Sequence, residues 1–485
     1  MVFTNLAKYV LPLHGTRKKL YSLEKGKITK VIILAVFALT FTDMLFAQKP
    51  LGKINGVQKV VFYGDSITQG GWYLYYIQLF YATRFPDMRI TIENAGVSGA
   101  SATTSLPRLE SDVLSSKPDI VYIMFGMNDV GRNYYRVSNP NQKTMEAREK
   151  SLETYKNKMN ETIKRIKASG ASPVILTPSP YNQYGMHINV ENFVECNEGL
   201  IKCAEIAKAL ALENNSPAVD IHSPMTELLV KYPELKFAAR DRIHPGKFGH
   251  MIMAYYILLS QNVPGLVCKA TIDVKTKSVE NIEKCLIKSL EIKDGCIKFM
   301  YIPKALPFPV SEEYMEAKRI VPWDSLNQEI IQIKNLADGN YKLLVAGKEI
   351  EKFSAEQFER GVNIALLTTP SQKKSNDLRT AVIKKANAES PLRNIAQVNS
   401  ILQSSSVDPS DTVAANKYFE YFCTKLNDKL KRYYTRLFET YCKNRGKFPE
   451  LTKKAVDAQK NIFELQKPEP FEIEIVRSIN PDRHF

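Results

Sequence analysis

From about residue 56 to 262, the hydrophobic and polar positions of the chain alternate between two patterns, one typical of strands and one typical of helices. Short apolar runs alternate there with longer stretches in which apolar residues recur every three or four positions. Buried strands that alternate with amphipathic helices predict a parallel sheet covered by helices on both faces. The apolar runs are 60–63, 89–92, 120–125, 173–177 and 218–221, and the helical stretches are 73–84, 106–114, 145–168, 191–213 and 248–260.

The pattern changes after Pro264. Between residues 269 and 368, short alternating segments are separated by turns rich in Gly and Asn, which predicts a small antiparallel, β-sandwich-like accessory module. From 371 to 485 the pattern is helical and rich in Lys. Aromatic and leucine residues recur at spacings of three and four within 412–443, and we interpret this stripe as packed core. The predicted divisions are therefore 56–264, 269–368 and 371–485.

Residues 1–47 have the pattern of a secretory signal peptide. A basic region precedes the apolar run 31–41, and a small residue, Ala47, ends the segment. The apolar run is short for a membrane span and Asp43 interrupts its end, so a retained signal anchor is the less favoured interpretation. We predict cleavage near Ala47, export to the periplasm or the exterior, and no membrane span in the mature chain.

Charge and cysteine content narrow the classes of partner. The formal charge is +16, and it would be +11 without the seven basic and two acidic residues of the first 47. A basic surface attracts acidic polysaccharide, anionic lipid or nucleic acid. No nucleic-acid motif accompanies the charge, so we interpret it as a solvated helical surface and predict no nucleic-acid partner. None of the seven cysteines forms a ligand cluster with His, which predicts no structural metal.

Four short motifs place reactive side chains after the predicted strands. Ser66 follows the run 60–63, Gly96 follows 89–92 and Asn128 follows 120–125, while Asp241 and His244 lie in the loop before the last helical stretch. Ligands of open α/β sheets bind at the carboxyl ends of the strands. We therefore expect these residues to converge on one site although they are far apart in sequence.

Together these residue types supply what serine-type acyl transfer needs. We predict Ser66 as nucleophile, His244 as general base and Asp241 as the acid that orients the base. The backbone N–H groups of Ser66 and Gly96 and the amide of Asn128 would form the oxyanion hole. Each residue alone has an ordinary role as a helix cap, turn or surface residue, and it is the combination that favours catalysis.

Three further polar residues near the motifs are expected to be structural. We expect Asp65 and Asp129 to hold loops or cap helices, and His250 to belong to the last helix.

A second serine offers an alternative nucleophile. Residues 96–100 read Gly-Val-Ser-Gly-Ala, which resembles the Gly-x-Ser-x-Gly elbow except that Ala100 replaces its last glycine. In the fold with that elbow, the acid and the histidine come from separate loops. Here Asp241 and His244 are three residues apart, so Ser66 is favoured over Ser98.

In content and order the four blocks resemble the SGNH/GDSL-type hydrolases, a family named after its Ser, Gly, Asn and His blocks. In this chain they are Ser66, Gly96, Asn128 and His244, and the resemblance covers about residues 57–264. It implies a three-layer α/β/α, flavodoxin-like fold and ester hydrolysis without a cofactor. The family includes carbohydrate acetylesterases, lipases, lysophospholipases and thioesterases.

We therefore expect an exported serine esterase that removes acyl groups, above all O-acetyl groups, from carbohydrate. The signal peptide, the absence of a long apolar acyl-binding run and a β module able to bind glycan favour this substrate. Two alternatives stay open: a lysophospholipase or lipase-type hydrolase, and a non-catalytic glycan-binding protein on the same fold. Aromatic residues near the motif loops that could stack on sugar rings are Tyr63, Trp72, Tyr75, Tyr134, Tyr135, Tyr181 and Tyr184.

Overall fold

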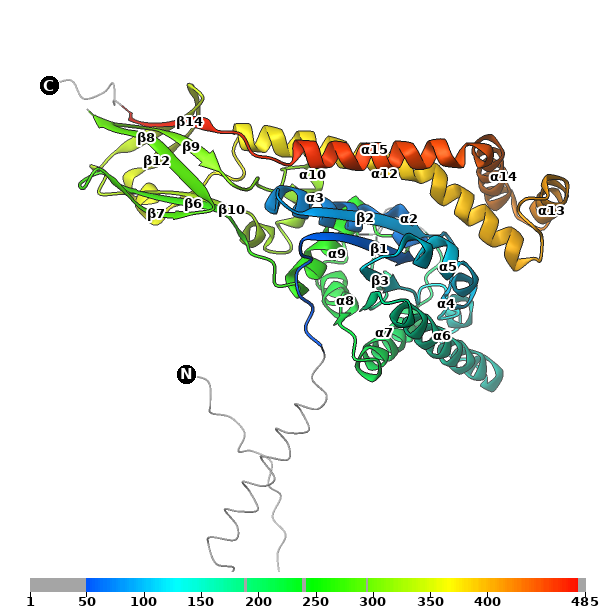
Figure 1. The fold of residues 1–485 in the computed structure, drawn as a ribbon. Coiled ribbons are helices and arrows are strands. Elements are labelled where there is room, and N and C mark those ends of the chain that lie inside the picture. Colours follow the sequence, from blue (N-terminus) through cyan, green and yellow to red (C-terminus); the bar gives the residue numbers. More distant parts are fainter. Residues whose placement is uncertain (1–48, 187–189, 238–240, 294, 479–485) are drawn as a thin grey trace, which may run out of the picture. The chain divides into compact units, whose positions relative to one another are not determined.

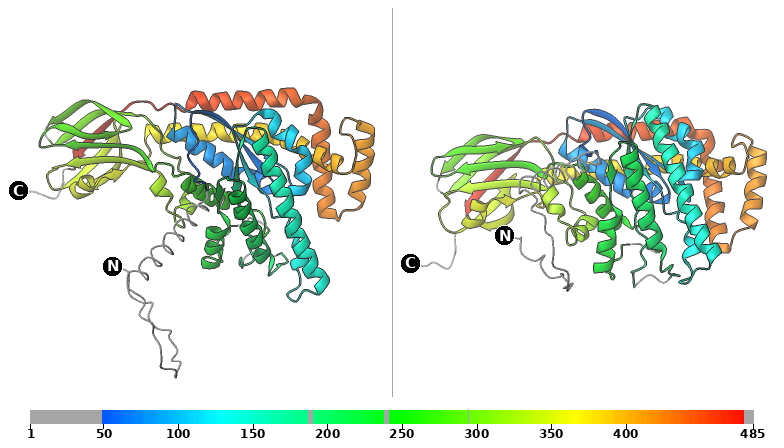
Figure 2. Two further views of the ribbon diagram at one scale, coloured as in Figure 1. Left: turned by 60° about the horizontal axis from the view of Figure 1, so that its bottom comes forward. Right: turned by 90° about the horizontal axis from the view of Figure 1, so that it is seen from below.

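The structure is a computed structural model that describes residues 49–186, 190–237, 241–293 and 295–478 (Figures 1 and 2). The predicted signal peptide, 1–47, lies outside the described residues. Among the helices of the described ranges, none combines the length and the apolar character needed to cross a bilayer.

A five-stranded parallel sheet forms the centre of the first part of the chain. Its order is β2-β1-β3-β4-β5, the flavodoxin-like order. The chain adds β2 on one side of β1 and then crosses to add β3, β4 and β5 on the other side. Most residues of the central strands are buried, which explains their continuous apolar runs. The predicted α/β fold is confirmed. The strands are β1 (Val57–Gly64), β2 (Arg89–Gly96), β3 (Ile120–Met124), β4 (Ser172–Leu176) and β5 (Ala218–Val219).

Helices cover the sheet on both faces (Figure 1). In one layer α3 (Trp72–Arg84) packs against α9 (Lys247–Ser260), and in the other α6 (Gln142–Ala168) packs against α7 (Cys196–Glu213). The shorter helices of this part are α2 (Ser66–Gly70), α4 (Ala102–Ser105), α5 (Leu109–Asp112) and α8 (His222–Lys231).

The accessory module consists of two sheets that share one apolar core. Ile272 and Ile331 from one sheet and Phe299, Leu343 and Ile473 from the other belong to this core. The pairings are antiparallel as predicted, except that β6 and β10 run parallel. One sheet has the order β13-β10-β6-β7 and contains β6 (Leu266–Asp273), β7 (Ser278–Glu283), β10 (Gln328–Lys334) and β13 (Val362–Asn363). The other has the order β12-β11-β14-β9-β8 and contains β8 (Cys285–Lys293), β9 (Cys296–Pro303), β11 (Asn340–Val345), β12 (Lys348–Ser354) and β14 (Phe471–Arg477).

Two short helices, α10 (Glu312–Ala317) and α11 (Ala355–Arg360), interrupt the accessory module. Four helices follow it: α12 (Pro370–Ser404), α13 (Thr412–Thr424), α14 (Asp428–Asn444) and α15 (Phe448–Leu465). The views of Figures 1 and 2 agree that α12 and α15 lie side by side along the first part of the chain. The aromatic stripe of 412–443 is divided between α13 and α14. Most of it packs with α12 into a separate core, as its spacing indicates, but Leu430 and Tyr433 are exposed.

The region predicted as helical ends in a strand. β14 lies between β9 and β11 in the second accessory sheet. Its sequence alternates, with Phe471, Ile473 and Ile475 buried. A lone strand gives a weak local signal when its partners lie more than a hundred residues earlier, because pairing over that separation leaves no hairpin pattern in the sequence.

Candidate active site

The predicted nucleophile lies where β1 ends and α2 begins. A Cβ on Gly64 would lie 2.2 Å from Thr68 Oγ1 and 2.7 Å from the Met124 carbonyl oxygen, so only glycine fits this close turn. Asp65 then caps α2, since its Oδ1 accepts a hydrogen bond from Ile67 N at 2.9 Å. Ser66 is the first residue of the helix, and its N–H therefore has no partner within the helix.

The three residues of the predicted triad are brought together. Ser66 Oγ lies 2.7 Å from His244 Nε2, and His244 Nδ1 lies 2.8 Å from Asp241 Oδ2. The same carboxylate accepts the backbone N–H of His244 at 2.7 Å and of Ile243 at 2.9 Å. With Nδ1 donating to Asp241, Nε2 is left as the acceptor for the serine hydroxyl, which is the arrangement a general base requires.

The environment keeps Asp241 ionised. Burial alone would raise its pKa, but the hydrogen bonds from the side chain and backbone of His244 outweigh burial and lower the pKa to about 2. The Asp241 side chain is 40% exposed and the His244 side chain 46%, so the site is open to solvent.

Gly96 has a packing role in this structure. A Cβ at this position would lie 2.1 Å from Gln69 N, so a glycine is required for the backbone of α2 to pass β2. Its N–H donates to Asn94 Oδ1 at 2.9 Å. Donation to an oxyanion would require that hydrogen bond to open, and the oxyanion role of Gly96 stays a prediction.

Gly99 is a candidate donor that the sequence analysis missed. It is exposed, its φ is +79°, and within the described residues its N–H makes no hydrogen bond. Its neighbour Ser98 lines the same cavity as Ser66. A glycine three residues after the end of a strand, in a conformation that other residues rarely adopt, is the signal that would have pointed to it.

The Asn128 side chain is held in a defined orientation. Its Nδ2 donates to the Ala100 carbonyl at 2.8 Å, and its Oδ1 accepts from Arg132 Nη1 at 3.0 Å. One amide hydrogen is thus used and a second is left for an oxyanion. Arg132 was not predicted, since nothing in the sequence marks it as the residue that orients Asn128.

The two buried acids next to the motifs hold loops, as expected. Asp129 accepts the N–H of Gly126 at 2.9 Å and of Ala102 at 2.8 Å, which ties the loops after β2 and β3 together. Burial raises the pKa of Asp129 to about 7 and that of Asp65 to about 6.

His250 is structural. Its Nδ1 accepts the N–H of Tyr73 at 3.3 Å, and its ring stacks on the Tyr73 ring with centroids 5.7 Å apart. Burial lowers its pKa to about 3, so it stays neutral.

The alternative nucleophile, Ser98, is less well placed. Ser98 N donates to Gln69 Oε1, but within the described part of the chain the Ser98 hydroxyl has no hydrogen bond to His244. His244 Nε2 is instead engaged by Ser66. The geometry therefore favours Ser66.

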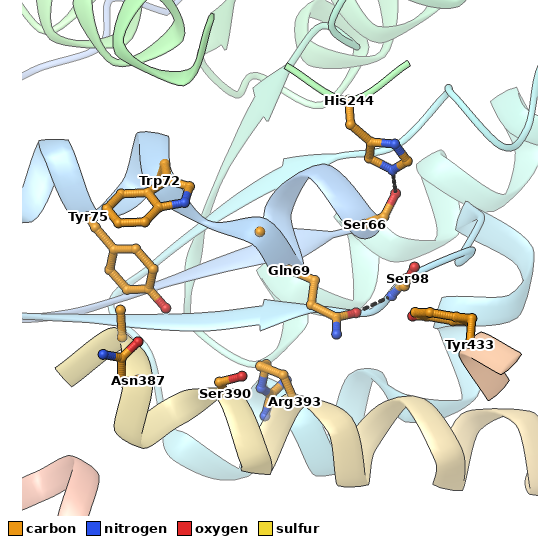
Figure 3. A pocket seen from close by; sticks show the side chains of 12 residues that line it. Ser66, Gln69, Trp72, Tyr75, Ser98, His244, Asn387, Ser390, Arg393 and Tyr433 are labelled. Atoms are coloured by element: carbon orange, nitrogen blue, oxygen red, sulfur yellow. Dashed lines mark hydrogen bonds between the residues drawn. The ribbon is translucent and has the colours of Figure 1, made fainter. Parts of the chain in front are cut away.

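A cavity of about 430 Å³ opens over Ser66, within the range of small-molecule sites (Figure 3). One wall belongs to the first part of the chain and the other to α12 and α14. No sequence motif predicted that these two helices would line the cavity. Of the aromatic residues expected near the site, Trp72 and Tyr75 line this cavity, and Tyr63 is fully buried. The lining residues are Ser66, Gln69, Gly70, Trp72, Tyr75, Ser98, His244, Ala386, Asn387, Ser390, Arg393 and Tyr433.

Asn128 and Tyr134 line a second cavity of about 380 Å³. In the described ranges, no three His, Cys, Asp or Glu side chains are grouped as a metal site requires, and all seven cysteines are free thiols.

The first part of the chain matches a known protein family. The model of the GDSL-like Lipase/Acylhydrolase family covers residues 62–252. An acetylxylan esterase of Geobacillus stearothermophilus is 28% identical over 218 residues, which are 42% of this chain and 93% of the esterase. A "Probable rhamnogalacturonan acetylesterase" of Bacillus subtilis is 28% identical over 171 residues, which are 35% of this chain and 68% of that protein.

One similar solved structure extends beyond this part. A gut microbial diltiazem-metabolizing enzyme superposes with a TM-score of 0.80 at 26% identity. The match covers 89% of this chain and 100% of that enzyme.

Proposed function

We propose that the chain is a carboxylic ester hydrolase, and more specifically an exported acetylesterase that acts on carbohydrate, because residues 62–252 match the GDSL-like Lipase/Acylhydrolase family. One observation carries the proposal of a serine mechanism. Ser66 Oγ and Asp241 Oδ2 occupy the two nitrogens of the His244 ring at 2.7 and 2.8 Å.

In the proposed reaction, Ser66 Oγ attacks the carbonyl carbon of the ester while His244 Nε2 takes the serine proton. The carbonyl oxygen becomes an oxyanion that accepts hydrogen bonds from the Ser66 N–H and the Asn128 amide. When the intermediate collapses, the ester C–O bond breaks and His244 returns the proton to the leaving alcohol. Water, activated by His244, then releases acetate and restores Ser66.

The substrate class rests on relatives and on the character of the cavity. The names of the two bacterial relatives describe esterases for acetylxylan and rhamnogalacturonan. The cavity offers hydroxyl, amide and guanidinium groups beside the rings of Trp72, Tyr75 and Tyr433. Sugars need this combination, because their hydroxyl groups require hydrogen bonds and their C–H faces stack on aromatic rings. The basic and apolar pattern of 1–47 supports export.

The first experiment compares hydrolysis of p-nitrophenyl acetate by the chain from Gln48 with that of Ser66→Ala and Ser98→Ala. We expect the Ser66 variant to lose activity by a factor of about 10⁴ or more, because no other hydroxyl of the described residues is bonded to His244. The Ser98 variant keeps the Ser66–His244 pair and should retain most of its activity. Equal activity of wild type and Ser66→Ala would remove Ser66 as nucleophile.

A series of p-nitrophenyl esters from acetate to palmitate tests the acyl group. Fastest turnover of acetate is expected, and a preference for long chains would instead favour the lipase or lysophospholipase alternative. Diltiazem belongs in the same series, since the structural neighbour that covers 89% of the chain metabolises it. Glycan binding without hydrolysis of any ester would leave the non-catalytic alternative.

A further inference from the structure

The cavity over Ser66 has a second wall that comes from the C-terminal helices. Ala386, Asn387, Ser390 and Arg393 lie on one face of α12, since residues three and four apart on a helix share a face. Figure 3 shows this face opposite Ser66 and His244, with Gln69 between them. The acetylxylan esterase aligns with 42% of this chain over 93% of its own length. A minimal esterase of the family is therefore complete without such a wall.

A chain of amide hydrogen bonds connects this wall to α2, the helix that begins at the nucleophile. Gln69 Oε1 accepts the N–H of Ser98, and Gln69 Nε2 donates to Gln397 Oε1 at 3.3 Å. Gln397 Nε2 donates to Tyr433 Oη at 3.2 Å, which joins α12 to α14. Gln397 is fully buried. The wall is thus held at a set distance from Ser66, as a binding surface must be.

Arg393 is the charged residue of this wall, and its guanidinium has few partners. Its side chain is 16% exposed, and among the described residues its one ion pair is with Asp112, at 3.7 Å. Asp112 also pairs with Arg108 at 2.9 Å, so two guanidinium groups face one carboxylate. Within the described part of the chain, no N–H of the Arg393 guanidinium makes a hydrogen bond.

Two other charged side chains near the cavity, Glu389 and Lys247, have partners. Glu389, on the same helix, is bonded to Lys385 Nζ at 2.6 Å and to Tyr75 Oη at 3.1 Å. Lys247 lies 4.5 Å from the centre of the Trp72 ring and 3.6 Å from a Glu313 carboxylate oxygen. Arg393 therefore leaves one uncompensated positive charge, with free donors, in a largely buried position on the cavity. Such a group favours a planar anion that accepts two parallel hydrogen bonds.

We propose that Arg393, with Asn387 and Ser390, forms a subsite for the alcohol part of the ester, and that it selects an acetylated sugar that carries a carboxylate. Arg393 binds the carboxylate, Asn387 and Ser390 bind neighbouring hydroxyl groups, and Tyr433 lines the cavity beside Ser98 (Figure 3). The specificity of this enzyme thus comes from the C-terminal helices. This inference rests on the proposed acetylesterase function.

The test uses two substrates that differ in one group. Methyl glucuronoside and methyl glucoside, acetylated at the same hydroxyl, carry the same ester. The glucuronoside has a carboxylate where the glucoside has a hydroxymethyl group. For the wild-type chain from Gln48 we expect a kcat/KM at least about tenfold higher on the glucuronoside, the scale of one charge-assisted hydrogen bond. Arg393→Gln should bring this ratio close to one, and Arg393→Lys should give an intermediate ratio because it keeps the charge but not the planar fork.

Arg436 provides the matched control. It is an exposed arginine on α14 and does not line the cavity, so Arg436→Gln should leave the ratio unchanged. The proposal is overturned if wild type has no preference for the glucuronoside. It is also overturned if Arg393→Gln lowers kcat/KM for the two substrates by the same factor, or if Arg393→Gln and Arg436→Gln change the ratio equally. Hydrolysis of p-nitrophenyl acetate by wild type in the same preparation separates these outcomes from a failure of the esterase function itself.

A measurement on wild type alone covers the case in which Arg393→Gln does not fold. Unacetylated methyl glucuronoside and methyl glucoside are compared as competitive inhibitors of p-nitrophenyl acetate hydrolysis. The glucuronoside should inhibit more strongly, and its advantage should shrink as salt is raised, because screening weakens a partly exposed ion pair. Equal inhibition by the two sugars would contradict the proposal.

Discussion

At the scale of single residues, the site depends on hydrogen bonds whose direction matters as much as their length. The two oxygens of Asp241 are both acceptors: Oδ1 binds two backbone N–H groups and Oδ2 binds His244 Nδ1. An asparagine at this position would keep Oδ1 on the backbone and turn its NH₂ toward Nδ1. His244 would then have to accept at Nδ1 and carry its proton on Nε2, where it cannot take the serine proton.

We therefore predict that Asp241→Asn lowers kcat for p-nitrophenyl acetate by about 10³–10⁴ while the protein stays folded. Steady-state kinetics and the thermal unfolding midpoint are measured together. Asp87→Asn, at an exposed position, is the control and should match wild type in both. Retention of more than a tenth of the activity by Asp241→Asn would mean that Asp241 does not orient His244.

Whether a site residue could be predicted depends on how local its role is in the sequence. Ser66, Asp241 and His244 form short motifs with fixed roles, so sequence reasoning found them and the structure brings them together. Gly96 was assigned a donor role from its position after a strand. Its N–H is engaged by Asn94, a local side-chain contact that spacing alone does not reveal.

At the scale of elements, the position of α12 on the first part of the chain depends on a buried ion pair. Lys385 is 2% exposed, and its Nζ donates to Glu389 and to the Ile92 carbonyl at the sheet. Removing one partner of such a pair leaves the other charge buried and uncompensated. Replacing both partners with apolar residues avoids that cost.

We predict that Lys385→Met lowers the free energy of unfolding by about 3–5 kcal/mol and that Lys385→Met with Glu389→Leu recovers most of this loss. Denaturant unfolding of both variants gives the two values. Lys384, the exposed neighbour on the same helix, is the control, and Lys384→Met should change stability by less than about 0.5 kcal/mol. A double variant less stable than the single one would show that the pair stabilises the docking of α12 beyond mutual neutralisation.

The helix α3 shows what sequence pattern can and cannot specify for an element. Apart from Trp72 at its start, all of its residues are buried, because α9 and α12 both pack against it. An apolar face all round a helix predicts burial on every side. The sequence does not say which element supplies the second cover, because that depends on pairing across about 300 residues.

At the scale of the whole molecule, the chain returns to its accessory module after building the helical wall. β14 follows α15 and pairs with both β9 and β11, so it occupies the middle of a five-stranded sheet. Phe471, Ile473 and Ile475 contribute to the core that the two accessory sheets share. The first and last segments of the module are thus separated by the helices that line the cavity.

This topology predicts that the end of the chain is required for the accessory module. A chain that ends after residue 470 lacks β14, which leaves the facing edges of β9 and β11 unpaired and opens the core between the sheets. We expect it to bind the dye ANS and to unfold in an earlier transition than the full chain. A chain that ends after residue 478 retains β14 and should behave as the full chain does. Equal unfolding curves for the two truncations would mean that the module holds together without its central strand.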